Sequence, residues 1–173
     1  MNVEDYLDKQ GCIFKLTAHE PVYTAEQLAT VEHVPPHHVA KTVIVRADND
    51  TFYLCVLPAD RKVSLYNLKQ HLDVEHLRLA TESEMERLFA DAEVGAEPPF
   101  GNLYNLPTLM DKTLAKDKEI VFQAGTHDRA IRMAMDDYMR LAHPTVLKFS
   151  YPTAFDEIES MPLDPFFYDP FQL

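Results

Sequence analysis

Several short stretches of the chain place apolar residues at helical spacing behind a residue that can cap a helix N-terminus. Asn2 precedes Val3 to Gln10, and Gly11 follows this stretch as a C-terminal stop. The spacing of Thr24 with Gln27, and of Thr81 with Glu84, is that of a capping box. These signals predict helices over residues 3–10, 24–32, 64–71 (behind Ser64), 81–89 and 136–142 (behind Asp136).

Other stretches alternate apolar and polar residues, or are rich in β-branched and aromatic residues, which predicts strands. They cover residues 13–17, 42–47, 51–57, 77–80, 107–110, 119–123, 130–135 and 146–149. The segment Asp48-Asn49-Asp50 joins the second stretch to the third and has the composition of a tight hairpin turn. The predicted fold is α+β with a mixed sheet, in a single domain over residues 1–150.

The composition changes at Tyr151 to proline, aspartate, phenylalanine and tyrosine. Prolines at positions 152, 162, 165 and 170 prevent any long regular element in this segment. We therefore expect residues 151–173 to form an extension and not a second domain. The segment is too aromatic for a fully solvated tail, so we expect it to pack on the body or on a partner subunit.

The length of 173 residues suits one domain that buries its own core. The formal net charge of −12 counts against a nonspecific nucleic-acid binder, because phosphate affinity comes from clustered lysine and arginine. No basic-plus-apolar leader and no apolar run of membrane-spanning length occurs. With two cysteines and no zinc-ligand spacing, the chain is expected to be cytoplasmic, with no DNA or membrane partner and no metal.

Glycine is scarce, with four residues in the whole chain, and two of them bracket the heptapeptide Gly95-Ala-Glu-Pro-Pro-Phe-Gly101. Glycine lets a backbone approach a ligand closely, whereas proline fixes φ and lacks an N–H group. This loop is therefore stiff and poor in side chains, and it is suited to presenting its backbone N–H groups. Pro98 and Pro99 cannot donate, so the other five residues must supply the N–H groups.

Three segments in the same order carry a family resemblance: Val39-Ala-Lys41-Thr-Val-Ile-Val45, Gly95-x-x-x-Pro99-Phe-Gly101 and Ala124-Gly125-Thr126-His127. Over roughly residues 17–147 the chain resembles the YbaK/prolyl-tRNA synthetase-associated domain family, which is similar to the inserted editing domain of bacterial prolyl-tRNA synthetases. The resemblance implies a mostly antiparallel, partly barrel-like sheet with flanking helices. It also implies a trans-acting aminoacyl-tRNA deacylase that needs no metal or organic cofactor.

The resemblance implies a role for each matching residue. Lys41 would engage the terminal adenosine and its phosphate. Gly95 and Gly101 would frame the loop whose amides receive the oxyanion of the attacked ester. The substrate pocket would be lined by the residues between and beyond them: Ala96, Glu97, Pro98, Pro99, Phe100, Gly125, Thr126 and His127.

Sequence physics leaves alternatives open for the charged members of this set. Lys41 can be a snorkelling lysine whose stem covers apolar surface. Glu97 can bind the α-ammonium group of the substrate or be a solvated loop carboxylate. His127 can belong to the pocket or be a hydrogen-bonded histidine at a strand end.

Other polar residues give weaker signals. His33, His37 and His38 lack the i, i+4 spacing and the glutamate of a helical zinc site. Ser64 and Cys55 lack the sequence context of a nucleophile. The basic residues Arg61, Lys62 and Lys69 are candidates for acceptor-stem contacts, or belong to a solvated charged face.

Two functions from different classes follow. One is hydrolysis of the ester in mischarged aminoacyl-tRNA, which would proofread translation. The other is a noncatalytic module of the same fold that recognises an aminoacyl-tRNA, a synthetase or an amino-acid-like ligand. The expected partner is the acceptor end of aminoacyl-tRNA, and an aminoacyl-tRNA synthetase is a further candidate.

Overall fold

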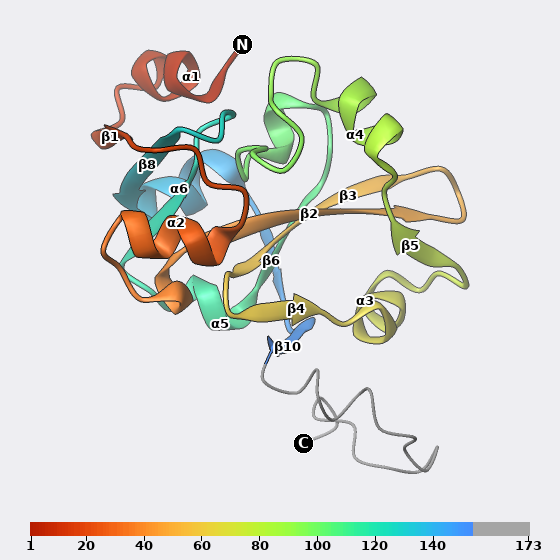
Figure 1. Ribbon diagram of the computed structural model, residues 1–173. Coiled ribbons are helices and arrows are strands. Elements are labelled where there is room, and N and C mark those ends of the chain that lie inside the picture. The colour runs from red at the N-terminus through yellow and green to blue at the C-terminus, as the bar shows by residue number, and fades with distance from the viewer. Residues whose placement is uncertain (154–173) are drawn as a thin grey trace.

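The computed structural model describes residues 1–153 as an α+β fold in which three β-sheets are flanked by helices (Figure 1). The larger sheet has five strands in the order β5-β2-β3-β6-β9. Their bounds are Leu77–Leu79, Ala40–Ala47, Phe52–Pro58, Thr108–Asp111 and Thr145–Leu147. Pairing is antiparallel from β5 to β3 and parallel from β3 to β9, so the predicted mixed sheet is confirmed.

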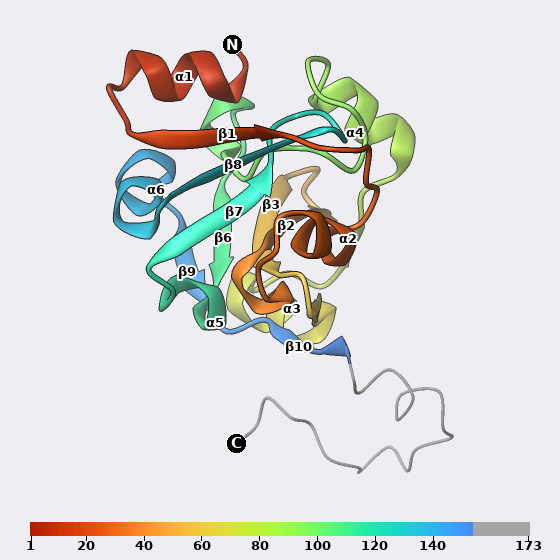
Figure 2. The ribbon, with the colours of Figure 1, turned by 60° about the vertical axis from the view of Figure 1, so that its left-hand side comes forward.

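A second sheet of three antiparallel strands, β1-β8-β7, lies beside helix α1 in Figure 2. These strands span Phe14–Ala18, Arg129–Ala134 and Glu119–Gln123. An isolated bridge between Val39 and Val121 joins this sheet to the start of β2. A third sheet pairs β4 (Arg61–Val63) with β10 (Ser150–Pro152).

The helices pack around these sheets, with α2 against β7 and α6 against β7 and β8 (Figures 1 and 2). The α-helices α1 to α6 span Val3–Lys9, Ala25–Val31, Leu65–Leu72, Glu82–Leu88, Lys112–Ala115 and Met135–Ala142. The 3₁₀-helices η1 and η2 span Pro36–His38 and Gly101–Leu103. Among the described residues no helix is both long and apolar enough to cross a membrane.

The main hydrophobic core draws residues from both larger sheets and from α1 and α6. Phe100, Phe122 and Tyr138 are among its largest buried side chains. Two smaller clusters lie under α2 and under α3. The buried members of the core alternate along the strands, as expected when one face of each strand meets the core.

Most of the predicted helix starts are confirmed by their capping bonds. The side chains of Asn2, Ser64 and Thr81 accept the expected backbone N–H groups, and Thr81 with Glu84 forms a complete capping box. At Thr24 only half of the box forms, because Gln27 Oε1 accepts the N–H of Tyr23 and not that of Thr24.

The prediction that Asp136 caps the last helix was wrong. Helix α6 begins at Met135 behind Ala134, which makes no side-chain capping bond, and Asp136 lies in the first turn. A carboxylate in the first turn is still favourable there because it faces the positive end of the helix dipole.

Five elements were not expected from the sequence: α5, β4, β10 and the two 3₁₀-helices η1 and η2. In β10, Tyr151 and Pro152 pair with Lys62 and Arg61, so the body of the fold continues slightly past residue 150. The rest of the segment that we expect to form an extension, residues 154–173, lies outside the described residues.

Candidate functional site

The Gly95–Gly101 loop connects α4 to η2 and is hydrogen-bonded to the second glycine motif. Ala96 O accepts the N–H of Gly125 at 2.9 Å, and Glu93 N donates to Gly125 O at 2.8 Å. Gly95 and Gly125 both have a φ of +92°, a conformation that favours glycine. Two motifs thirty residues apart in the sequence therefore form one unit in the fold.

His127 ties this unit to a third segment of backbone. Its Nδ1 lies 3.0 Å from Val22 O, and its Nε2 lies 3.0 Å from Val94 O. The N–H of His127 donates to Glu93 Oε2 at 3.2 Å, and the ring packs on Tyr23 at a centroid distance of 4.8 Å. His127 is thus a hydrogen-bonded histidine that also borders the glycine loop.

The positive φ explains why position 95 carries glycine, because other residues are strained in this conformation. A Cβ atom there would lie 3.4 Å from Cε1 of His127, which is an ordinary contact distance. Thr126 lies between Gly125 and His127 and donates its hydroxyl to Asp128 Oδ1 at 2.8 Å.

Glu97 is buried, with 4% of its surface exposed, and is therefore not a solvated loop carboxylate. Its Oε1 accepts the N–H of Gly95 at 2.9 Å. Burial raises the pKa of the Glu97 carboxyl, while hydrogen bonds from the amides of Gly95 and Glu97 and the charge of His127 partly oppose that rise. The carboxylate thus occupies two loop amides in the way that an anionic ligand would.

The other loop amides bond to groups with less freedom to move. Ala96 N donates to Glu93 O at 2.9 Å, and Phe100 N donates to Pro98 O at 2.8 Å. Gly101 N donates to the buried hydroxyl of Thr108 at 2.9 Å. Each described loop amide therefore has an internal acceptor, and the acceptor shared by Gly95 and Glu97 is the end of a long side chain.

The far end of the loop is anchored in the core. Phe100 is fully buried and packs edge-on against Tyr138, Phe122 and Tyr6, with ring centroids 5.1, 5.7 and 5.9 Å away. Tyr138 donates its hydroxyl to Pro99 O at 2.7 Å. The side chain of Phe100 therefore anchors this end of the loop in the hydrophobic core.

Lys41 lies at the start of β2, where Ala40 joins the main core. The Nζ atom of Lys41 is 3.5 Å from Ala59 O, on the β3–β4 connection. Next to this carbonyl, the ring of His37 lies 3.7 Å from Asp60 Oδ1 and 3.8 Å from Asp117 Oδ1. The ammonium group thus bonds to a backbone carbonyl, and Lys41 is half-buried as a snorkelling lysine would be.

The basic residues of the first half of the chain lie in different surroundings. Arg61 donates from Nε to Ser150 Oγ and from Nη2 to Ser150 O. Lys69, Arg46 and Arg78 help to line a hollow of about 470 Å³, which no residue of the glycine loop borders. Within residues 1–153 no group of three or more His, Cys, Asp or Glu side chains could hold a metal ion.

Three residues that contact the loop were not expected from the sequence: Tyr138, Thr108 and Glu93. Tyr138 had a detectable signal, because it lies with Leu141 on the apolar side of an amphipathic helix. A tyrosine at a core position usually finds a partner for its hydroxyl. The partner itself could not be read from the sequence.

Comparisons with known proteins identify a family for this chain. The family described as "Aminoacyl-tRNA editing domain" matches residues 19–141. The chain is 27% identical over 147 residues to the multifunctional Ser/Thr-tRNA deacylase ProXp-y of Escherichia coli strain K12, covering 83% of this chain and 87% of that protein. It is 23% identical over 140 residues to the prolyl-tRNA editing protein ProX of Acetoanaerobium sticklandii, covering 78% and 85%.

A solved structure shows the same fold. The crystal structure of a candidate trans-editing enzyme for prolyl tRNA synthetase superposes with a TM-score of 0.77 at 20% identity, covering 86% of this chain and 94% of that one. The family match spans most of the chain and includes Lys41 and both glycine motifs. The chain therefore belongs to the aminoacyl-tRNA editing domain family.

Proposed function

We propose that this protein is an aminoacyl-tRNA deacylase that hydrolyses the ester of mischarged tRNA in trans. The observation that carries the proposal is the joining of the Gly95–Gly101 loop to Gly125 and His127 in a member of the editing family. This joined unit offers a rigid wall of backbone amides, which suits recognition of an ester carbonyl.

In the proposed reaction, water adds to the ester carbonyl and produces a tetrahedral oxyanion. The oxyanion takes the place of the Glu97 carboxylate, whose Oε1 lies 2.9 Å from Gly95 N, and accepts a hydrogen bond from the N–H of Gly95. The intermediate then breaks its bond to the ribose oxygen, and the proton from water passes to that leaving oxygen through the neighbouring ribose hydroxyl. Gly101 serves this step as the brace of the loop, since its amide bonds to Thr108.

Glu97 has a second part in the proposal once its carboxylate leaves the loop amides. A carboxylate beside the ester can pair with the α-ammonium group of the amino acid. Phe100, buried in the core, fixes the wall formed by Ala96, Pro98 and Pro99. A wall that cannot expand selects small amino acids by volume, which is where synthetase pockets discriminate poorly.

Lys41 anchors the RNA end in this proposal. A lysine ammonium is a point charge suited to phosphate. Lys41 lies at the start of β2, with its Nζ atom 3.5 Å from Ala59 O. The adjacent residue, Ala40, belongs to the same hydrophobic core as Phe100 of the loop. Thr126 and His127 border the amino-acid side of the pocket.

A second candidate function is a noncatalytic module that binds aminoacyl-tRNA or a synthetase. The observation that favours it is that each described loop amide already has an internal acceptor. In this case the Glu97 carboxylate stays in place and the loop recognises its ligand by shape.

The test is a deacylation panel with alanyl, seryl, threonyl, cysteinyl and prolyl tRNA under limiting protein. Multiple turnovers on at least one ester support the enzyme, and binding without turnover selects the module. Lys41→Ala should lower kcat/KM by about tenfold or more, equal to about 1.4 kcal/mol. The matched control Lys118→Ala removes an exposed lysine ahead of β7 and should keep wild-type activity. Equal activity of Lys41→Ala and wild type would contradict the role of Lys41.

A further inference from the structure

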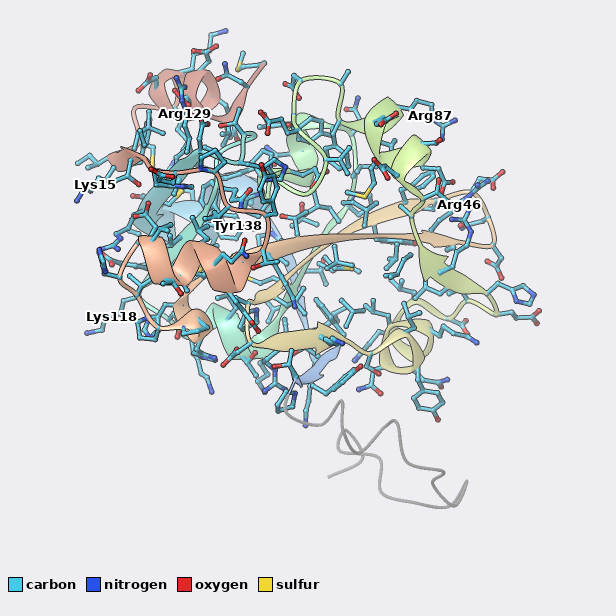
Figure 3. The ribbon with its side chains drawn as sticks, viewed as in Figure 1. Lys15, Arg46, Arg87, Lys118, Arg129 and Tyr138 are labelled. Carbon is cyan, nitrogen blue, oxygen red and sulfur yellow. The ribbon has the colours of Figure 1, made fainter. Side chains whose placement is uncertain are left out.

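Tyr138 is a buried tyrosine on α6 that meets the glycine loop from inside the protein. It has no exposed surface, and Figure 3 labels its position in the fold. Its hydroxyl donates to Pro99 O at 2.7 Å, across 39 positions of sequence. Burial raises the pKa of this phenol, so it stays protonated and remains a donor.

The bond answers a structural need that the two prolines create. Pro98 and Pro99 have no N–H, so the middle of the loop cannot donate to the rest of the fold. Its backbone can form hydrogen bonds only through its carbonyl oxygens. Pro98 O is taken by Phe100 N inside the loop, and Pro99 O is taken by Tyr138. The Tyr138 hydroxyl thus ties the proline pair to another element of the fold.

The Tyr138 ring adds a second restraint at the same place. It packs edge-on against Phe100 at 5.1 Å, so one side chain holds both the Pro99 carbonyl and the ring that follows it. A tyrosine is needed for both contacts, because phenylalanine would supply the ring alone. An unpaired buried carbonyl would then be left behind.

We infer that Tyr138 is a positioning residue for deacylation, whose hydroxyl sets the Pro99 peptide and through it the direction of the Gly95–Gly101 amides. The inference rests on the proposed deacylase function. A donor that must meet charge only in the transition state is sensitive to small displacements. Loosening the loop therefore lowers kcat while the RNA contacts that set KM remain.

The test compares Tyr138→Phe with Tyr6→Phe. Tyr6 is a partly buried tyrosine that also packs on Phe100. Its hydroxyl donates to Leu141 O on α6 and accepts from Asn102 Nδ2, which has Leu141 O as a second acceptor, so the hydroxyl bonds to no residue between 95 and 101. We expect Tyr138→Phe to lower kcat by about tenfold to a hundredfold, with KM within about threefold. Tyr6→Phe should keep kcat within about twofold of wild type. Thermal unfolding of both variants measures how much stability each hydroxyl supplies.

A second measurement does not depend on activity. Amide hydrogen exchange at Gly95, Ala96 and Phe100 should become faster in Tyr138→Phe and stay unchanged in Tyr6→Phe. Unchanged exchange, or an unchanged kcat in an active protein, would overturn the role of Tyr138. Loss of kcat in both variants in proportion to lost stability would also overturn it, because the effect would then be general. If wild type hydrolyses none of the esters, the proposed function fails, and the exchange experiment still decides whether Tyr138 positions the loop.

Discussion

The glycine loop and the charged hollow at the Arg46 end of the five-stranded sheet are held by different kinds of contact. The loop is fixed by backbone bonds and by the buried side chains of Glu97, Thr108 and Tyr138. At the hollow, Arg46 and Arg78 share the carboxylate of Glu84, and Arg46 also pairs with Asp50. The loop thus depends on a few buried bonds, and the hollow on partly exposed ion pairs.

This difference separates the charged hollow from the proposed site. The hollow gathers three basic residues, yet its arginines are already neutralised by their acidic neighbours. Exposed ion pairs are screened by salt and hold geometry loosely. The glycine loop takes no part in lining this hollow, but its buried bonds keep each peptide group in one orientation. Fixed orientation is what the proposed chemistry requires.

The largest expected effect comes from filling the space at Gly101. A Cβ atom there would lie closer than 3.0 Å to Leu106 O and to Thr108 Oγ1, and backbone cannot yield easily. Gly101→Ala should therefore destabilise the protein by about 3 kcal/mol and abolish deacylation. Urea unfolding measures the first effect, and the ester panel the second.

Gly11→Ala is the matched control. Gly11 has a φ of +66°, but a Cβ atom at this position would have no heavy atom within 4 Å. The substitution therefore costs only backbone strain, about 1 kcal/mol. If the two variants unfold at the same urea concentration, close packing at Gly101 is not what holds the loop.

A smaller effect, with a distinct pH signature, is expected for Glu97→Gln. The amide oxygen of glutamine can still accept the N–H of Gly95, so the loop should keep its shape. Burial raises the pKa of Glu97 in the folded state above its unfolded value. The stability linked to protonation is therefore present below the unfolded pKa and is lost as the pH rises through the folded one. Wild type should lose stability relative to Glu97→Gln between about pH 4 and neutrality.

Two measurements follow from this variant. Chemical unfolding at about pH 4 and pH 7 should show the gap in midpoint opening toward neutrality in favour of Glu97→Gln. An equal difference in midpoint at the two pH values would mean that burial does not raise the pKa of Glu97. In the deacylation assay KM should rise by about tenfold, because the α-ammonium loses its counter-charge. A variant that equals wild type would remove the ammonium role.

The local parts of the fold could be predicted because their causes are local. The hairpin around Asp48-Asn49-Asp50 and the caps at Asn2, Ser64 and Thr81 depend on residues within a few positions of one another. The helix α5 escaped prediction because it has four residues and is capped by Asp111 at a strand end, with no periodic pattern to read.

The site also has features that the sequence predicts and features that depend on the packing of distant segments. The two glycine motifs stand out by composition, and the family resemblance links them without any knowledge of the hydrogen bonds between them. The burial of Glu97 and the bond from Tyr138 to Pro99 could not be read, because each depends on how distant segments pack. Loop composition suggested free amides, whereas packing supplies an acceptor for each of them.

The smallest expected effect concerns the ion pairs at the hollow and separates the two regions directly. The hydrogen bond from Arg78, then the amide of Thr81 and the guanidinium of Arg46, hold the pKa of Glu84 well below its ordinary value. A lowered folded pKa adds stability above the unfolded pKa, and this stability is lost as the pH falls through the folded one.

Glu84→Gln keeps an oxygen for the helix cap and removes the charge. It should lower the melting temperature slightly at neutral pH and low salt, with full deacylation activity. The difference from wild type should shrink at about 1 M salt and again in strong acid, since both conditions weaken the ion pairs. A loss of activity in this variant, at unchanged melting temperature, would mean that the charged end and the loop are coupled and that the contrast between them does not hold.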